Sequence, residues 1–279
     1  MANETTSSTI SELYTEIVAE ALFVAQEQSI MRGLVRNYSI AGGGKSVEVP
    51  IYANVAAAAV NEATDLSNTA VNPSSVTITA AEVGIMTTLT DLARNSASRN
   101  VAADIGRLFG EAVATKIDTD LAALFTGFST EKGPGAGSEI TVQDLFECAA
   151  ELKTNKAPGP YYGVFHPKQI FNVKKSLTNT FVGRDTELSN EAMRTGFVGN
   201  VAGIQIFESS NIAVDGSDDS IGGVFSQDAL GLAMMQDLKI ESQRDASLRA
   251  DEIVATAVFG VGELHDSYGV KITADTLAA

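Results

Sequence analysis

Two histidines are the first residues to test for catalysis or metal binding, because imidazole serves both chemistries near neutral pH. His166 directly precedes Pro167 at the end of a predicted strand, a position that favours a role in the turn. His265 lies beside Glu263 and Asp266, but no second histidine or cysteine stands at ligand spacing. The spacing therefore predicts no zinc site, and neither histidine is assigned a catalytic role.

Acidic residues could bind calcium, or act in pairs as general acid and base. Asp215, Asp218 and Asp219 lack the glycine and glutamate positions of a calcium-binding loop, so we interpret them as a solvated turn. Glu62 and Asp65 could form a carboxylate pair, but they occupy the tip of a predicted hairpin. Acid–base catalysis requires carboxyl groups held rigidly in a sheltered pocket, so this pair is not predicted to be catalytic.

The glycine-rich run Gly42-Gly43-Gly44-Lys45-Ser46 is similar to part of a phosphate-binding loop. That motif needs a further glycine where this chain has Ser39, and it needs a helix where this chain has a predicted strand. A flexible hinge at the root of the hairpin is the better interpretation. The chain also lacks a Gly-x-Ser-x-Gly nucleophile motif and a dinucleotide fingerprint. We therefore predict no enzymatic activity, no cofactor and no metal.

Composition restricts the class of protein further. The chain has 279 residues, of which 44% are hydrophobic, and a net charge of −16. A surface this acidic repels nucleic acid, so binding of DNA through charge is not expected. The single cysteine, Cys148, excludes an intramolecular disulfide and is expected to be a buried small side chain. No apolar run reaches the roughly 20 residues of a membrane span, so we expect a soluble protein made in cytoplasm.

The stretch from Lys45 to Leu92 has the alternating pattern of a long β-hairpin with an acidic tip, and β-branched residues dominate it. A ribbon with so few large apolar side chains cannot form a core of its own, and an isolated two-stranded ribbon is marginal in water. We therefore predict that it lies across a neighbouring copy of the same protein. Its contact residues would be Val47, Val49, Ile51, Val76 and Ile78.

An amphipathic helix is predicted on each side of the hairpin. The first begins at a capping box formed by Thr9 and Glu12 and ends near Gly33. The second begins at Ser98 or Asn100 and reaches about Phe128, a length of roughly 40 Å at 1.5 Å per residue. Its apolar face includes Val101, Ile105, Leu108, Phe109, Val113, Ile117, Leu121 and Phe125. Its charged face includes Arg107, Glu111, Lys116, Asp118 and Asp120.

From Ser138 onward the pattern changes to mixed helix and strand. Thr141 and Asp144 mark the start of a helix, and Pro167 marks the start of another. Strands are predicted over 161–165, 203–208, 224–229, 231–235, 238–244, 252–259 and 268–273. The alternation of apolar and polar residues over 238–244 is typical of a half-solvated antiparallel strand, with 252–259 as its partner.

The order of these parts resembles the tailed-phage major capsid protein family, which has the Hong Kong 97-type fold. Short strings resemble that family too: Val49-Pro50-Ile51 with Asn61-Glu62, Thr90-Asp91-Leu92 with Ser96, Phe165-His166-Pro167, Gly199-Asn200-Val201-Ala202-Gly203 with Ser209-Ser210, and Tyr268-Gly269-Val270. The resemblance runs from about Leu13 to Thr273. It implies an α+β fold divided into an N-terminal arm (1–44), an extended hairpin loop (45–91), a peripheral domain with a spine helix (92–138), an axial domain (139–230), peripheral strands (231–262) and a C-terminal segment that rejoins the axial domain (263–279).

By this resemblance the chain would be the major capsid protein of a tailed double-stranded DNA phage. Its copies would form pentamers and hexamers of an icosahedral virion shell in the host bacterial cytoplasm, with portal and scaffolding proteins as assembly partners, without membrane or sequence-specific DNA contacts. At the arm tip, Glu62 and Asp65 would meet basic residues of a third subunit, Arg244 or Arg249. The family's lysine–asparagine crosslink cannot be assigned to residues here.

Two alternatives stay open at this point. One is the shell of an encapsulin nanocompartment, which shares the fold and encloses enzymes in place of a genome. The other is a soluble enzyme with an α/β domain.

The first predicted helix begins within about a dozen residues of Met1, whereas many family members carry a long scaffolding extension there. This difference favours a separate scaffolding protein or an already matured chain.

Overall fold

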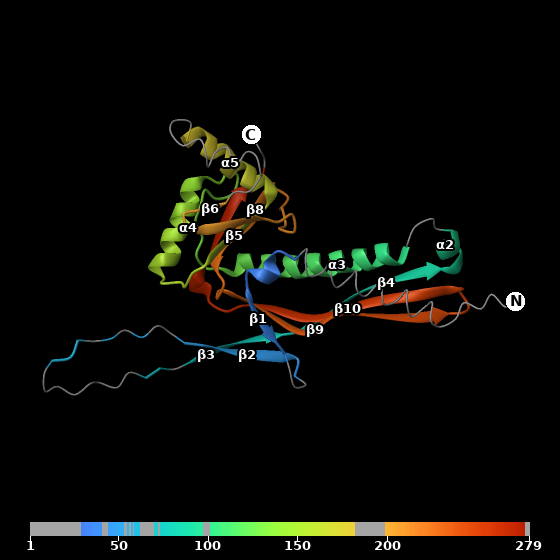
Figure 1. The fold of residues 1–279 in the computed structure, drawn as a ribbon. Coiled ribbons are helices and arrows are strands. Elements are labelled where there is room, and N and C mark those ends of the chain that lie inside the picture. Colours follow the sequence, from blue (N-terminus) through green and yellow to red (C-terminus); the bar gives the residue numbers. More distant parts are fainter. Residues whose placement is uncertain are drawn as a thin grey trace.

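The computed structural model describes residues 29–40, 44–52, 55, 57, 59–61, 70–71, 73–96, 101–181 and 199–276. In these residues the strands form three sheets (Figure 1). A four-stranded sheet has the order β1-β9-β10-β4, a five-stranded sheet has the order β11-β8-β5-β7-β6, and β2 pairs with β3 alone. The helix predicted to start at Thr9 falls almost entirely outside the described residues; the last residues before its predicted end form the 3-10 turn η1 (Met31–Gly33).

The four-stranded sheet is built on a long antiparallel ribbon. Its strands are β1 (Arg36–Ser39), β4 (Ala81–Thr90), β9 (Leu230–Asp245) and β10 (Ala250–Glu263). Helix α3 (Val101–Ala123) packs along one face, and the 3-10 turn η2 (Leu124–Gly127) extends it. The first hydrophobic core lies between helix and sheet and includes Phe109, Val113, Ile117, Leu121, Phe125, Ile240, Ile253 and Phe259. The predicted long helix is thereby confirmed.

The five-stranded sheet forms a second layer around its own core. Its strands are β5 (Tyr161–Phe165), β6 (Asn200–Val201), β7 (Ile204–Glu208), β8 (Asp219–Ser226) and β11 (Gly269–Asp275). Helices α4 (Val142–Thr154) and α5 (Pro167–Phe181) cover it (Figure 1). The predicted start of α4 is confirmed, because Thr141 and Asp144 form a capping box. Cys148 is buried in this core, where burial raises the pKa of its thiol to about 12.

The C-terminal strand β11 joins the second sheet rather than the first. It pairs antiparallel with β8 along its whole length. Its other edge is covered by the loop after α3, since the backbone amide of Lys132 donates to the carbonyl of Lys271 and that of Lys271 donates to Thr130. The chain thus leaves the first sheet at Glu263, and its last described strand, β11, belongs to the second sheet. The loop after α3 makes a further connection between the two layers through its hydrogen bonds to Lys271.

Two predictions for the chain after the hairpin are wrong. The run from Ile85 to Thr90 was assigned to the hairpin region 45–91, but it forms part of β4, which pairs with β10. The physical reason is that the backbone groups of β4 find hydrogen-bonding partners along β10, whereas the backbone groups of β2 and β3 are already paired with each other. Two residues of α3 differ from the predicted faces of the helix. Leu108, predicted on the apolar face, is 60% exposed, and Asp118, predicted on the charged face, is 1% exposed.

No helix in the described part of the chain has the length and hydropathy needed to cross a membrane.

Candidate interaction surface: the arm and its root

The predicted hairpin consists of a root that packs on the body and an arm that leaves it. Strands β2 (Ser46–Ile51) and β3 (Ser74–Thr79) pair antiparallel over six residues each and form the root. We call the described residues between them, 52–73, the arm. Figure 1 shows the arm continuing from β2 and β3 away from both sheets. The prediction of a projecting hairpin is therefore confirmed for the arm only.

The root is buried by its own chain. Val49 and Ile78 belong to a third hydrophobic cluster with Ile40, Ala80, Ala233 and Leu264, and Val47, Ile51 and Val76 pack partly against it. The prediction that these five residues have no cover within their own chain is wrong for Val49 and Ile78, which are 8% and 1% exposed. Sequence periodicity marked the apolar face of the root but could not show that β9 and β10 pass beneath it.

Two glycines of β10 make this close crossing possible. A Cβ at Gly260 would lie 2.3 Å from the carbonyl oxygen of Thr79, and one at Gly262 would lie 2.9 Å from Cγ1 of Ile78. Both distances are too short for a real side chain, so only glycine lets β3 lie on β10 at these points. The glycines thus fix the place where the arm leaves the body.

The arm itself exposes apolar side chains. Tyr52, Val55, Val60 and Val71 are 61%, 55%, 49% and 51% exposed. Single exposed apolar residues are ordinary, but several on one projecting segment indicate a surface that is covered in the functional state. Glu62 and Asp65, the predicted contact residues of the tip, lie outside the described residues.

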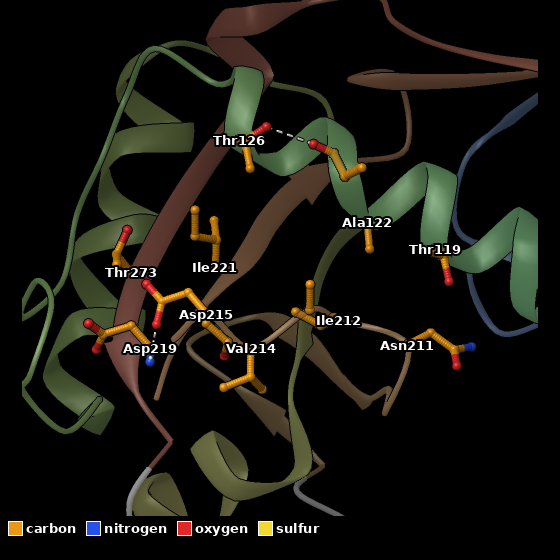
Figure 2. A pocket seen from close by; sticks show the side chains of 13 residues that line it. Thr119, Ala122, Thr126, Asn211, Ile212, Val214, Asp215, Asp219, Ile221 and Thr273 are labelled. Carbon is orange, nitrogen blue, oxygen red and sulfur yellow. Dashed lines mark hydrogen bonds between the residues drawn. The ribbon is translucent and has the colours of Figure 1, made fainter. Parts of the chain in front are cut away.

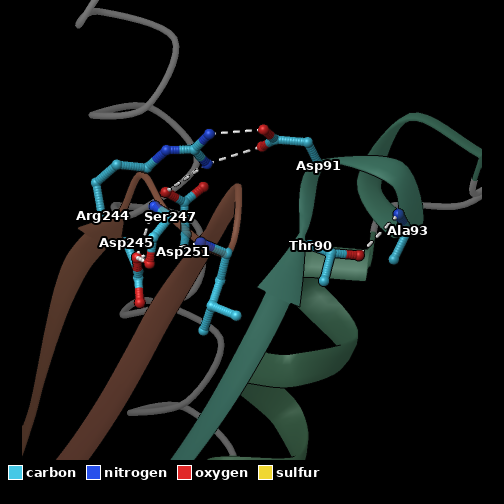
Figure 3. Close-up of polar contacts among 8 residues, drawn as sticks. Thr90, Asp91, Ala93, Arg244, Asp245, Ser247 and Asp251 are labelled. Atoms are coloured by element: carbon cyan, nitrogen blue, oxygen red, sulfur yellow. Dashed lines mark hydrogen bonds and ion pairs between the residues drawn. The ribbon is translucent and has the colours of Figure 1, made fainter.

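Arg244 and Arg249, the basic residues predicted to meet that tip, differ in their surroundings. Arg244 donates hydrogen bonds to both carboxylate oxygens of Asp91, at 2.8 and 2.6 Å, and to Asp251 at 3.2 Å (Figure 3). These hydrogen bonds raise the pKa of its guanidinium. Arg249 is exposed and forms no ion pair within the described part of the chain. Arg244 is therefore already paired with carboxylates of its own chain, whereas the contact predicted for either arginine with another copy stays a prediction.

The N-terminal segment is anchored on α3 by the buried carboxylate of Asp118. This carboxylate accepts hydrogen bonds from the Ser29 hydroxyl at 2.7 Å and from the backbone amides of Ile30 and Met31, both at 3.1 Å. Burial raises the pKa of Asp118, whereas these hydrogen bonds and one from Asn211 oppose the rise. The helical period placed Asp118 on the charged face, and no sequence signal distinguished it from its exposed neighbours.

A pocket of about 270 Å³ lies between the C-terminal half of α3 and the segment that leads into β8 (Figure 2). Its two carboxylates hold the local backbone. Asp215 accepts hydrogen bonds from the amides of Ser217 and Asp219, and Asp219 accepts one from the amide of Gly137. The predicted turn is thus present, and its carboxylates are engaged as acceptors of backbone hydrogen bonds rather than directed at a substrate.

The histidines have structural surroundings as well. Nδ1 of His166 accepts a hydrogen bond from the amide of Lys168, and the ring of His265 stacks on Tyr268. Burial lowers the pKa of both histidines. In the described residues no three histidine, cysteine or acidic side chains gather in a group able to hold a metal ion.

The described chain thus combines a long helix on a four-stranded sheet, a second α/β layer and a projecting arm that exposes apolar side chains. The chain belongs to a phage capsid protein family, whose model matches residues 73–272. This family membership confirms the resemblance inferred from the sequence and gives the chain the role of a phage capsid protein, a structural rather than catalytic class. No curated protein is similar enough in sequence to match.

Solved structures share the fold at low sequence identity. The capsid of cyanophage P-SCSP1u is 21% identical, with a TM-score of 0.69 over 88% of each chain. A structure from Mycobacterium phage Che8 is 23% identical, with a TM-score of 0.66 over 82% of this chain and 85% of that one. A virus-like particle from Pyrococcus furiosus is 12% identical, with a TM-score of 0.63 over 92% of this chain and 98% of that one. At these identities the likeness concerns the fold alone.

Proposed function

We propose that this chain is the major capsid protein of a tailed double-stranded DNA phage and that its copies form the pentamers and hexamers of an icosahedral shell. The observation that carries the proposal is the arm: a member of a phage capsid family exposes Tyr52, Val55, Val60 and Val71 on a segment that leaves its own body. Copies related by rotation can each place such an arm on the next, a head-to-tail contact that closes into a ring.

The two cores support a division of the chain into functional parts. The first core, around α3 and the four-stranded sheet, would be the peripheral domain, with α3 as its spine. The second, around the five-stranded sheet with β11, would be the axial domain at the centre of each capsomer. The extended loop would comprise the arm and its root, 45–80, because β4 belongs to the sheet. Residues 1–44 would form the N-terminal arm.

The charge of the chain supports enclosure of DNA without a tight grip on it. With a net charge of −16, the average surface repels phosphate. An acidic inner wall would let a genome be packed and released without sequence-specific contacts. Portal and scaffolding proteins would guide assembly in the bacterial cytoplasm.

Deletion of residues 55–72 tests the proposal. The root stays intact because its buried residues lie outside the deletion, so the subunit should keep its fold and its unfolding transition. Shells should be absent in negative-stain electron micrographs, whereas the parent chain should form them. Intact shells from the deletion variant would contradict the role of the arm, and a parent chain that stays monomeric when it is produced together with its scaffolding protein would contradict the capsid proposal itself.

A nanocompartment shell is the second candidate, because a virus-like particle from Pyrococcus furiosus shares the fold over 92% of this chain. The contents of shells isolated from the natural source distinguish the two candidates. Nuclease-protected DNA supports the capsid, whereas a co-purifying enzyme in place of DNA supports the nanocompartment.

A further inference from the structure

After α3 the described chain passes between the two layers at three places, and hydrogen bonds join these places to one another. The crossings are the loop 128–141 from η2 to α4, the connection 227–229 from β8 to β9, and the connection 264–268 from β10 to β11. The backbone amides of Leu264 and His265 both donate to the carbonyl of Ala229. The backbone amide of Ser129 donates to the carboxylate of Asp266 at 2.7 Å. We call this set of contacts the junction.

The junction is packed as well as hydrogen-bonded. Tyr268 contacts both the first and the second hydrophobic core. A Cβ at Gly269 would lie 2.1 Å from Cε1 of Phe128, and one at Gly127 would lie 2.8 Å from Oε2 of Glu263. The carboxyl group of Glu263 therefore lies against the backbone of η2, in the space that a side chain at position 127 would fill. A movement of one layer against the other must disturb these contacts.

Two carboxyl groups meet in the junction. Glu263 is half-buried at the end of β10, and its side chain hydrogen-bonds to that of Asp266. Both oxygens of Asp266 also accept hydrogen bonds from Ser129, one from its amide and one from its hydroxyl. Within the described residues neither carboxyl group forms an ion pair. A hydrogen bond between two carboxyl groups needs a proton on one of them. Burial and the neighbouring Asp266 raise the pKa of Glu263, so Glu263 carries this proton.

The other charged groups around the pair cannot replace this proton. Asp228 faces His265 from the connection between β8 and β9, and it forms an ion pair with Arg36. The ring of His265 stacks on Tyr268, and burial lowers its pKa. The lysines of the loop after η2 and of β11 are paired with glutamates, Lys132 with Glu151 and Lys271 with Glu131.

We infer that the junction is a pH-sensitive latch between the two layers, in which a proton shared by Glu263 and Asp266 holds the connection 264–268 to the loop after η2. With the proton present, Glu263 donates to Asp266, and Asp266 holds Ser129. Without it, two neighbouring carboxylates repel each other and the junction is held less firmly. The inference concerns the single subunit and does not depend on the proposed function.

The direction of the pH dependence follows from the carboxyl pair. The pKa of Glu263 is raised in the folded state, so the folded chain takes up this proton at a higher pH than the unfolded chain. The stabilising effect is therefore fully present below the ordinary pKa of glutamate and is lost as pH rises through the folded pKa. His265 acts in the opposite direction: because burial lowers its pKa, its protonation on acidification weakens the fold. Tightening of the junction on acidification thus distinguishes the carboxyl pair from the histidine.

Glu263→Gln tests the latch, because the amide of glutamine can donate to Asp266 at every pH. Hydrogen–deuterium exchange is compared between variant and parent at the same pH, so that the intrinsic exchange rate cancels. Near pH 7.5 the peptides covering 127–132 and 265–268 should exchange at least about threefold more slowly in the variant than in the parent. Near pH 4.5, where the parent holds its proton, the two chains should exchange alike.

Glu252→Gln is the matched control. It removes the same charge from the same strand, at a position that lies between Thr88 and Gln243 and away from the junction. Its exchange in 127–132 and 265–268 should equal that of the parent at both pH values. In a chain that already carries Asp266→Ala, Glu263→Gln should have no effect, because the acceptor is missing.

Three results with the variants would overturn the inference: Glu263→Gln exchanges like the parent near pH 7.5, its slower exchange persists near pH 4.5, or Glu252→Gln slows exchange in the junction equally. The parent chain provides a second test, which does not depend on how a variant folds. Its protection factors in 127–132 and 265–268 should rise on acidification relative to those in α4. A ratio that stays constant, or one that falls, would refute the latch.

Discussion

The Ser29 hydroxyl donates a 2.7 Å hydrogen bond to the buried carboxylate of Asp118, a residue 89 positions later in the chain. This contact, together with the amides of Ile30 and Met31, joins the start of the described chain to the C-terminal half of α3. Residues 29–31 are therefore held at a fixed place on α3.

Replacing Asp118 with asparagine should destabilise the subunit by about 2 kcal/mol, because the new NH₂ group would face the Ile30 amide and leave a buried donor unpaired. Urea unfolding of the unassembled chain measures this. Asp120→Asn is the control, since that side chain only pairs with Lys116 on the surface, and its cost should stay below about 0.5 kcal/mol. Equal costs would contradict the anchoring role.

The effect of Asp118→Asn on stability should depend on pH. Burial raises the pKa of Asp118 in the folded state above its ordinary value, so the folded state takes up a proton at a higher pH than the unfolded state. The contribution of this ionisation to stability is therefore greatest below the ordinary pKa of an aspartate and falls as pH rises through the folded pKa. The stability advantage of the parent over Asp118→Asn should grow on acidification from pH 7 towards 4, and a constant difference would count against this assignment.

Two buried amides of α5 should respond in opposite ways to replacement by leucine. Gln169 donates from Nε2 to the carbonyls of Ser220 and Ala274, at 2.9 and 3.0 Å. Asn172 is 1% exposed, and both of its side-chain polar atoms lack a hydrogen-bond partner among the residues that the structure describes. Gln169→Leu should cost about 2 kcal/mol, because it removes both of these buried hydrogen bonds and puts an apolar side chain against two carbonyl groups.

Asn172→Leu should instead raise stability by about 1 kcal/mol, since it removes an uncompensated buried amide. Thermal unfolding of the two variants side by side provides the measurement. A loss of stability in Asn172→Leu comparable with that of Gln169→Leu would show that Asn172 has a partner in solution.

Gly260→Ala should displace the root of the arm. The added methyl group would lie 2.3 Å from the Thr79 carbonyl oxygen, so β3 must move away from β10 at a cost of about 1–3 kcal/mol. Amide exchange in 74–80 should rise at the same time. Gly216→Ala, where a Cβ would meet nothing within 4 Å, should leave both stability and exchange unchanged. Identical behaviour of the two variants would mean that the crossing at Gly260 is not tight.

Arg244 and Arg249, near the end of the β9–β10 ribbon, should differ in their effect on amide exchange in α2, and a double-mutant cycle with Asp91 measures this difference. Arg244→Gln should speed amide exchange in α2 (Asp91–Ser96), because its bidentate contact holds the start of that helix on the sheet. The effect should disappear when Asp91 is already asparagine, and added salt should reduce it. Arg249→Gln, which removes no ion pair within the described residues, should leave exchange in α2 unaltered; a change as large as that of Arg244→Gln would refute the distinction.

The sequence by itself determined the class of protein and most of the elements. The 3.6-residue period specified α3, the capping box at Thr141 specified the start of α4, and alternation specified the pairing of β9 with β10. These features are local, so neighbouring residues suffice to encode them. The order of the elements was enough to indicate the capsid family, and the alternation in the hairpin was enough to indicate its paired strands β2 and β3.

Only the tertiary structure decided which parts of the hairpin need a neighbour. Val49 and Ile78 are covered by β9 and β10, Asp118 is a buried anchor and not a surface charge, and β4 is an edge of the four-stranded sheet formed by the described residues. Each of these facts depends on residues far apart in the chain that meet only after folding. Periodicity reports which face of an element is apolar, but the identity of what covers that face is a property of the assembled fold.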